Sequence, residues 1–195
     1  MILFNLNILE LNIYVSRILT SFFVILYISI AWFILDYIND VYLGFLQVSQ
    51  FVSAVYWLSG LRLLVIILFN EVGAIGLFLG YVLSGVLIRD FALQDAIILG
   101  VLSSVAPVIA YKLWLKITHI SGAFENVNFN KLFLLVFLHS AFTAVFRTSY
   151  LYLSARASDW HEIVVVFASN VCGALLFLYA LKYANLIYRA IKTPK

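Results

Sequence analysis

The stretch Leu58–Leu87, LSGLRLLVIILFNEVGAIGLFLGYVLSGVL, decides the fold of this chain. It is almost wholly apolar, but it contains Arg62 and a turn signal at Asn70–Gly73. A single bilayer crossing needs only about 20 residues, and Asn and Gly favour turns. The stretch therefore predicts a transmembrane hairpin that turns at Asn70–Gly73.

The composition places the whole chain in a membrane. Hydrophobic residues make up 65% of the 195 residues, charged residues make up 11%, and the mean hydropathy is +1.09. Soluble domains are about half apolar and about one quarter charged. The length leaves room for roughly six helices of the ~20 residues that a bilayer requires. We therefore expect one polytopic membrane domain over residues 1–195, with an N-terminal arm at 1–16 and a cytoplasmic tail at 189–195.

Six apolar segments predict an all-α integral membrane protein, a bundle of about six transmembrane helices. Residues 36–50 would form an outer loop, with an interfacial helix near Tyr42–Leu46. An alternative places the second crossing at 41–58 and runs one long helix from Arg62 to Ile88. The preferred segments are 18–35, 51–69, 72–88, 93–117, 131–153 and 162–188.

Basic residues indicate the orientation of the chain, because they are enriched on the cytoplasmic side of a membrane protein. With a cytoplasmic N-terminus, eight basic residues lie on the inner side and two on the outer side, while Arg62 and Arg147 fall within crossings. Both termini are therefore predicted in the cytoplasm. Sorting the basic residues by side also removes the suggestion of nucleic-acid binding that an isoelectric point near 9.0 would otherwise carry. The inner residues are Arg17, Lys112, Lys116, Lys131, Lys182, Arg189, Lys192 and Lys195, and the outer ones are Arg89 and Arg156.

Small residues recur every fourth position on the second arm of the predicted hairpin, at Gly76, Gly80 and Ser84. Such a pattern lets a neighbouring helix backbone approach closely. We expect these residues, together with Gly173 on the last segment, to serve helix packing. The sequence leaves open whether the neighbour belongs to the same chain or to a second copy.

Two arginines are predicted inside the bilayer, where a charge costs a few kcal/mol. Arg62 lies near the middle of its crossing, and Arg147 lies roughly 7 Å from the midplane. The nearest carboxylates are Glu71 at the inner turn and Asp95 near the outer end of the fourth segment. One interpretation is an anion-binding cavity, in which the guanidinium groups receive the carboxylate or phosphate of a ligand. The other is that helix carbonyls, water or these acids satisfy the arginines.

A polar stripe follows the fifth segment from His139 to Ser154, at spacings of four, four, three and four residues. This spacing puts the side chains on one helix face, which belongs in the bundle interior. The stripe indicates either a ligand pocket or hydrogen bonds between helices, and a proton relay at His139 is a third interpretation. Asn170 on the last segment falls at about the depth of Arg147. The candidate ligand-binding residues are therefore Arg62, His139, Thr143, Arg147, Tyr150 and Asn170.

Motifs of enzymes are missing from the sequence. It has no Gly-x-Ser-x-Gly turn, no His-Glu-x-x-His and no phosphate-binding glycine loop. Ser140 adjoins His139, so the two side chains point apart on a helix and do not suit an intramembrane hydrolase. The single cysteine, Cys172, excludes a disulfide within one chain. We expect no catalytic residue, no metal site and no cofactor, and a protein that is not an enzyme.

Glycine-containing motifs open both arms of the predicted hairpin, at Trp57-Leu58-Ser59-Gly60 and Gly76-Leu77-Phe78-Leu79-Gly80. They resemble the corresponding motifs of the MASE-type bacterial membrane-associated sensor domains, and Ser169–Gly173 is similar to the family's Gly-Asp-x-x-Gly. The prolines of the pattern are absent, and Asn170 replaces the aspartate. The resemblance implies a stand-alone sensor of the bacterial inner (plasma) membrane, which binds a ligand and signals through a separate protein.

Two alternatives belong to other classes of protein. The substrate-binding subunits of energy-coupling-type vitamin importers resemble this chain in size and in their six helices, but they carry an Ala-x-x-x-Ala seam where the first helix here is bulky. An accessory subunit of a membrane complex would use its arginines for lipid headgroups or partner carboxylates. In each case the expected partners are membrane lipid and either another membrane protein or a second copy of the chain.

Overall fold

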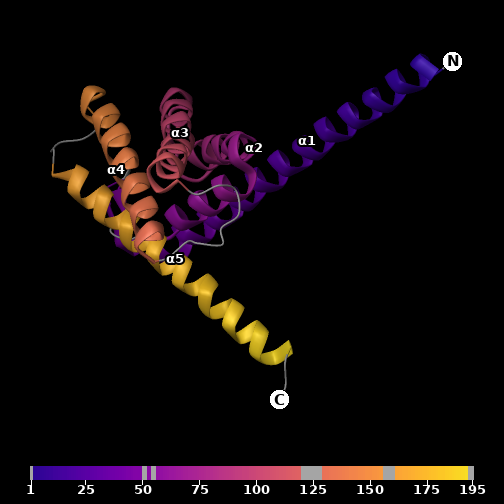
Figure 1. Ribbon diagram of the computed structural model, residues 1–195. Helices are drawn as coiled ribbons and strands as arrows, with labels where there is room; N and C mark the ends of the chain where they lie inside the picture. The colour runs from indigo at the N-terminus through magenta and orange to yellow at the C-terminus, as the bar shows by residue number, and fades with distance from the viewer. Residues whose placement is uncertain (1, 50–51, 54–55, 120–128, 156–160, 193–195) are drawn as a thin grey trace.

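A computed structural model of the chain describes residues 2–49, 52–53, 56–119, 129–155 and 161–192, and within them the protein is almost entirely helical (Figure 1). A 3-10 turn, η1 (Gly44–Leu46), and two antiparallel strands, β1 (Gln47–Ser49) and β2 (Val52–Ser53), lie between the first two helices. The helices are α1 (Ile2–Leu43), α2 (Leu58–Leu87), α3 (Leu93–Thr118), α4 (Phe129–Leu153) and α5 (Glu162–Lys192).

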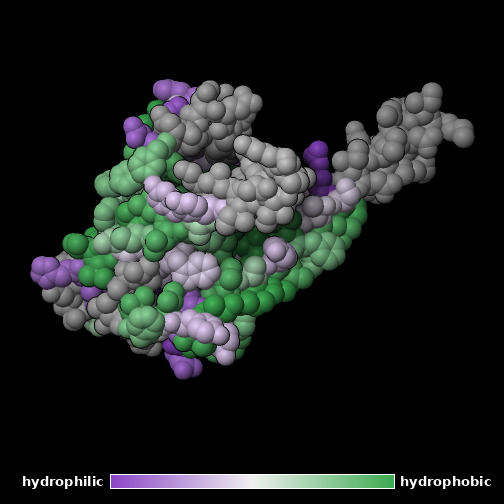
Figure 2. Space-filling model, turned by 90° about the horizontal axis from the view of Figure 1, so that it is seen from below, coloured by the Kyte–Doolittle hydropathy of each residue, from purple (hydrophilic) through white to green (hydrophobic). Residues whose placement is uncertain are grey.

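Each of these helices contains a stretch that is long and apolar enough to cross a membrane. Large hydrophobic side chains face outward, and Tyr27 on α1 is 73% exposed. Polar side chains such as Arg62 and His139 are instead buried between the helices. Figure 2 shows hydrophobic residues spread over the viewed face. Because soluble proteins have the reverse arrangement, this is the structure of a multi-pass membrane protein, as the composition predicts.

The helices α2, α3, α4 and α5 pack in a ring, each against the next, and α5 returns to α2. Helix α1 packs mainly against α2, and its N-terminal part projects beyond the other helices (Figure 1). Because α1 has 42 residues, it is about 63 Å long. The predicted outer loop at 36–50 is thus partly wrong, since residues 36–43 belong to this helix. Residues 2–16 of the predicted N-terminal arm are helical as well, and their position outside the crossings stays a prediction. Helix α5 extends to Lys192, four residues beyond the predicted end of the last segment at 188.

Helix α2 is broken at Asn70, where φ is 47° and ψ is −123°. A Cβ atom placed on Gly73 would lie 2.9 Å from the Val65 carbonyl oxygen, although eight residues of straight helix span about 12 Å. Arg62 and Tyr81 also meet across the break, with 6.0 Å between the guanidinium carbon and the ring centre. The chain therefore folds back on itself at the place where the turn signal predicts it.

The two arms of α2 differ in length. The first, 58–69, is about 18 Å long, and the second, 71–87, is about 25 Å long. The predicted crossing at 51–69 is too long as a helix, because α2 begins only at Leu58 and residues 52–53 form a strand. Strand β2 instead lies against α5. A helix N-terminus therefore starts inside the bundle, with Leu58 and Ser59 both completely buried.

Glycines on the second arm set the distance between α1 and α2. A Cβ atom on Gly76 would lie 2.8 Å from the Ile28 Cβ, and one on Gly80 would lie 2.7 Å from the Trp32 Cβ. Ser29 Oγ donates a hydrogen bond of 3.0 Å to the Gly76 carbonyl oxygen. The neighbour of this small-residue face is thus α1 of the same chain, and the contact brings Trp32 next to Arg62.

Candidate functional site

Arg62 lies in the second turn of α2 and is only 2% exposed. Its guanidinium carbon is 4.9 Å from the ring centre of Tyr56, 5.2 Å from that of Trp32 and 6.0 Å from that of Tyr81. These three rings come from the segment before α2, from α1 and from the second arm of α2. Helical side chains lean toward the N-terminus of their helix, and the contact with Tyr56 shows that Arg62 does so. We call these four residues the Arg62 box.

The Arg62 box supplies rings but no oxygen acceptor. Within the described ranges, no carboxylate, carbonyl or hydroxyl oxygen forms an ion pair or hydrogen bond with the Arg62 guanidinium. A guanidinium group carries five N–H donors, and burying a charge costs several kcal/mol. Each contact with an aromatic face returns about 0.5–2 kcal/mol but satisfies no donor. Within the part of the chain that the structure describes, Arg62 is therefore a buried cation without an anionic or polar acceptor.

Two further hydrogen-bond donors near Arg62 are buried without an acceptor among the described residues. The indole Nε1–H of Trp32, 1% exposed, and the hydroxyl of Ser59, fully buried, have no hydrogen-bond partner among the described residues. Ser59 belongs to the first turn of α2, which has no side-chain cap. The N-terminus of a helix carries a partial positive charge that favours anions. Donors and positive potential thus gather at one end of this helix.

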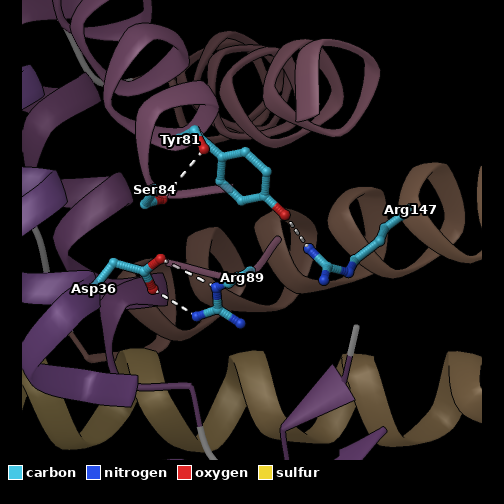
Figure 3. A network of polar contacts seen from close by, with 5 residues as sticks. All are labelled: Asp36, Tyr81, Ser84, Arg89 and Arg147. Atoms are coloured by element: carbon cyan, nitrogen blue, oxygen red, sulfur yellow. Dashed lines mark hydrogen bonds and ion pairs between the residues drawn. The ribbon is translucent and has the colours of Figure 1, made fainter. Parts of the chain in front are cut away.

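Arg147 on α4 reaches the same region through Tyr81. Its Nη1 donates a hydrogen bond of 2.8 Å to the Tyr81 hydroxyl oxygen, as Figure 3 shows. The Tyr81 ring in turn lies against Arg62. The two arginines that the sequence places within crossings therefore contact the same tyrosine side chain, Tyr81.

A largely buried ion pair near the Arg62 box joins α1 to the turn between α2 and α3. Arg89, in the turn between α2 and α3, donates to both carboxylate oxygens of Asp36 on α1, at 2.7 and 3.2 Å (Figure 3). Burial alone would lower the pKa of Arg89, but the neighbouring Asp36 carboxylate outweighs it and raises that pKa. The guanidinium therefore stays charged, and the pair joins the C-terminal part of α1 to the turn after α2.

The carboxylates that sequence considerations place nearest to the arginines have other partners. Glu71 accepts a hydrogen bond of 2.8 Å from Lys112, and both side chains are exposed. Asp95 accepts one of 2.7 Å from the Tyr150 hydroxyl. Glu71 therefore forms its ion pair with Lys112 and not with Arg62. The Tyr150 hydroxyl joins α4 to α3 through its hydrogen bond to Asp95.

The remaining predicted site residues are buried on α4 and α5. His139 is fully buried, with its Nδ1 3.5 Å from the Thr143 hydroxyl, and its Nε2 has no partner among the described residues. Asn170 donates to the Val166 carbonyl of its own helix at 2.7 Å, while its buried side-chain oxygen has no partner within the described ranges. The hydroxyl of buried Ser140 also has no hydrogen-bond partner among the described residues.

The packing places Ser140 and Asn170 at the same level. Val136 and Ala174 belong to one hydrophobic cluster, and Ala144 and Val166 belong to another. Ser140 lies four residues from both members on α4, and Asn170 lies four residues from both members on α5, so the two face the gap between the clusters. Gly173, one turn after Asn170, lies against the Tyr56 carbonyl. The polar interior thus continues from the Arg62 box to α4 and α5.

The sequence identifies the two arginines but misses most of their surroundings. Trp32, Tyr56 and Tyr81 carry no polar pattern that sets them apart, and Ser59 reads as part of a glycine motif. Asp36 and Arg89 read as membrane boundaries on separate segments. Comparison with protein-family models, with curated proteins and with solved structures finds no match for this chain.

Proposed function

We propose that this protein is a multi-pass membrane receptor that binds a small anion at Arg62 and signals through a separate membrane protein. One observation carries the proposal: Arg62 is buried between three aromatic rings and has no acceptor among the described residues. An anionic oxygen would accept from the planar guanidinium group and from the Trp32 indole or the Ser59 hydroxyl. Charge-assisted hydrogen bonds of this kind are the strong ones.

The aromatic faces suit such a receptor. They stabilise the cation from its sides and exclude water, which strengthens the attraction between a bound anion and the guanidinium charge. They also leave the edge of the guanidinium group for the ligand, which a carboxylate in the same place would occupy. An arginine needed only for structure would be expected to have such a carboxylate or a backbone carbonyl.

A thermal-unfolding experiment tests the anion site. The purified protein in detergent is unfolded by heat at increasing concentrations of acetate, phosphate or sulfate, with chloride keeping the ionic strength constant. A ligand at 100 times its Kd stabilises the folded state by about 2.7 kcal/mol, which raises Tm by several degrees. We expect a rise with at least one of these anions in the natural protein.

Variants assign that rise to Arg62. Arg62→Gln should lose it, because glutamine has no charge, and Arg62→Lys should retain part of it, because lysine keeps the charge without the planar fork. Arg17→Gln is the matched control, since Arg17 is exposed on α1, and it should respond as the natural protein does. An Arg62→Gln protein that folds and keeps the full rise would refute the anion site.

The proposal includes six crossings with both termini in the cytoplasm, in a bacterial inner membrane. The fold-back at Asn70 supports the sixth crossing, and so does the Asp36–Arg89 pair, because it joins two residues that are both expected outside. The Glu71–Lys112 pair joins two residues that are both expected inside. The eight-to-two distribution of basic residues supports the orientation.

Cysteine labelling tests this topology in a Cys172→Ser background. Asp90→Cys should react with a membrane-impermeant maleimide in intact cells, and Glu71→Cys should react only after the membrane is permeabilised. Both residues are exposed, so access to the reagent depends only on the side of the membrane. Labelling of Glu71→Cys from outside would contradict the proposed topology.

Signalling to a partner rests on the resemblance to MASE-type sensor domains. A photo-crosslinking amino acid at exposed Tyr14 or Phe22, on the part of α1 away from the ring, would trap a neighbour in cells. We expect a crosslinked membrane protein whose yield changes in Arg62→Gln. An equal yield in both proteins would separate ligand binding from signalling.

A further inference from the structure

A hydrophobic groove of about 270 Å³ lies beside the Arg62 box. It runs between α1 and α2 and is partly open to its surroundings. Its lining comes from α1, from the first arm of α2 and, through Leu77, from the second arm. The residues that matter below are Ala31 and Trp32 on α1 and Leu61, Val65 and Phe69 on α2.

Trp32 belongs to both the groove and the Arg62 box. Trp32 is one of the lining residues of the groove, its ring centre lies 5.2 Å from the Arg62 guanidinium carbon, and its buried Nε1–H has no partner among the described residues. Leu61, the neighbour of Arg62 in the chain, also lines the groove. A mostly apolar space therefore has Trp32 in its wall, and Arg62, which does not itself line the groove, lies behind it against the Trp32 ring.

We infer that the anion bound at Arg62 is the carboxylate of a medium-chain fatty acid, whose alkyl chain lies in the groove between α1 and α2. This inference rests on the proposed anion site and adds the chemical class of its ligand. The carboxylate matches the charge of Arg62 and the donor of Trp32, and the chain matches the apolar lining. A single water needs only about 10–15 Å³ of this kind of volume, so a groove of about 270 Å³ has room for an alkyl chain of medium length.

The position of the box favours a fatty acid over a phospholipid. Tyr81 lies eight residues before Arg89 on the second arm, which is about 12 Å along the helix. A phospholipid keeps its phosphate near the membrane surface, where Arg89 is expected to lie, and would have to draw that phosphate and its glycerol about 12 Å inward. A fatty acid ends in a compact carboxylate and has a single chain, so it suits one narrow groove.

Binding of radiolabelled decanoate and acetate tests the inference. Both are measured by equilibrium dialysis on protein in lipid nanodiscs, and the signal of empty nanodiscs is subtracted. Ala31→Trp fills the groove, whereas Ile30→Trp places the same bulk on an exposed neighbour outside it. We expect Ala31→Trp to weaken decanoate binding by about tenfold or more while acetate binding stays unchanged. Ile30→Trp should change neither.

The chain length gives a second measurement on the natural protein. From butyrate to decanoate, the affinity should rise by up to about fourfold per methylene group and then level off as the groove fills. Equal affinities of butyrate and decanoate, or equal decanoate binding by Ala31→Trp and Ile30→Trp, would overturn the fatty-acid inference. If Arg62→Gln still abolishes acetate binding in that case, the anion site stands. If Arg62→Gln leaves both acids bound, both proposals fall.

Discussion

Removing one partner of the Asp36–Arg89 pair should lower the free energy of unfolding by about 3 kcal/mol. Asp36→Asn keeps the shape of the side chain and removes its charge, which leaves the Arg89 guanidinium buried without its carboxylate. Breaking a buried ion pair costs about 3–5 kcal/mol. The side chains are 1% exposed for Asp36 and 11% exposed for Arg89, and partial access of water to Arg89 favours the lower value. For a chain of this length, that corresponds to a fall in Tm of roughly 6–12 °C.

Thermal unfolding of the detergent-solubilised protein measures this loss. Arg89→Gln should fall by a similar amount, and the double variant should lose clearly less than the sum of the single losses, because the removal of both partners leaves no buried charge unpaired. Glu71→Gln is the control, since it removes a carboxylate from an ion pair whose side chains are both exposed. If Asp36→Asn lowers Tm no more than Glu71→Gln does, then the buried pair does not hold α1 in place.

Three further substitutions test the hairpin and its packing. The backbone of Asn70, at φ 47° and ψ −123°, suits glycine and disfavours β-branched residues. Asn70→Gly should therefore leave the free energy of unfolding unchanged or raise it, and Asn70→Val should lower it by about 1–3 kcal/mol. Equal Tm values for the two variants would speak against a sharp turn. Gly80→Ala should cost about 1–3 kcal/mol, because its Cβ would lie 2.7 Å from the Trp32 Cβ. The control Gly44→Ala should leave the Tm unchanged, because a Cβ there meets nothing within 4 Å. A comparable loss in both variants would show that α1 does not pack on Gly80. Tyr81→Phe removes one acceptor of Arg147 and should cost about 1.5–3 kcal/mol in chemical denaturation. A cost no larger than that of Tyr27→Phe, a change at a side chain that is 73% exposed, would mean that the hydrogen bond adds nothing.

The sequence predicts the turn of the hairpin and the third and fourth helices well, because these features depend on local signals. Asn70 and Gly73 favour a turn wherever they stand, and the apolar segments at 93–117 and 131–153 end at polar residues. The length of α1 could not be predicted in this way. Asp36 and Asp40 read as the end of a crossing, yet Asp36 stays in the helix because Arg89, 53 residues away, neutralises it.

The start of α2 is missed for a different reason. Residues 51–57, FVSAVYW, are apolar enough for a membrane helix, but they are rich in valine and aromatic residues, which also favour extended backbone. A short apolar run cannot be assigned to helix or strand by its hydrophobicity alone. In the structure residues 52–53 form a strand, and the helix begins at Leu58. That later start puts the helix N-terminus at Leu58, about one turn before Arg62.

Arg62 itself could be found because a charge in an apolar stretch requires a reason, whereas its aromatic neighbours could not. Aromatic residues make up 17% of the chain. The sequence alone therefore does not single out the rings that contact the Arg62 guanidinium group. The turn at Asn70 does carry part of the answer. Residues at similar distances on either side of a helical turn lie at similar depth, and Arg62 and Tyr81 stand eight residues before and eleven residues after Asn70. Trp32 requires one more step, the contact of Gly80 with α1, and that contact depends on tertiary packing that no local pattern encodes.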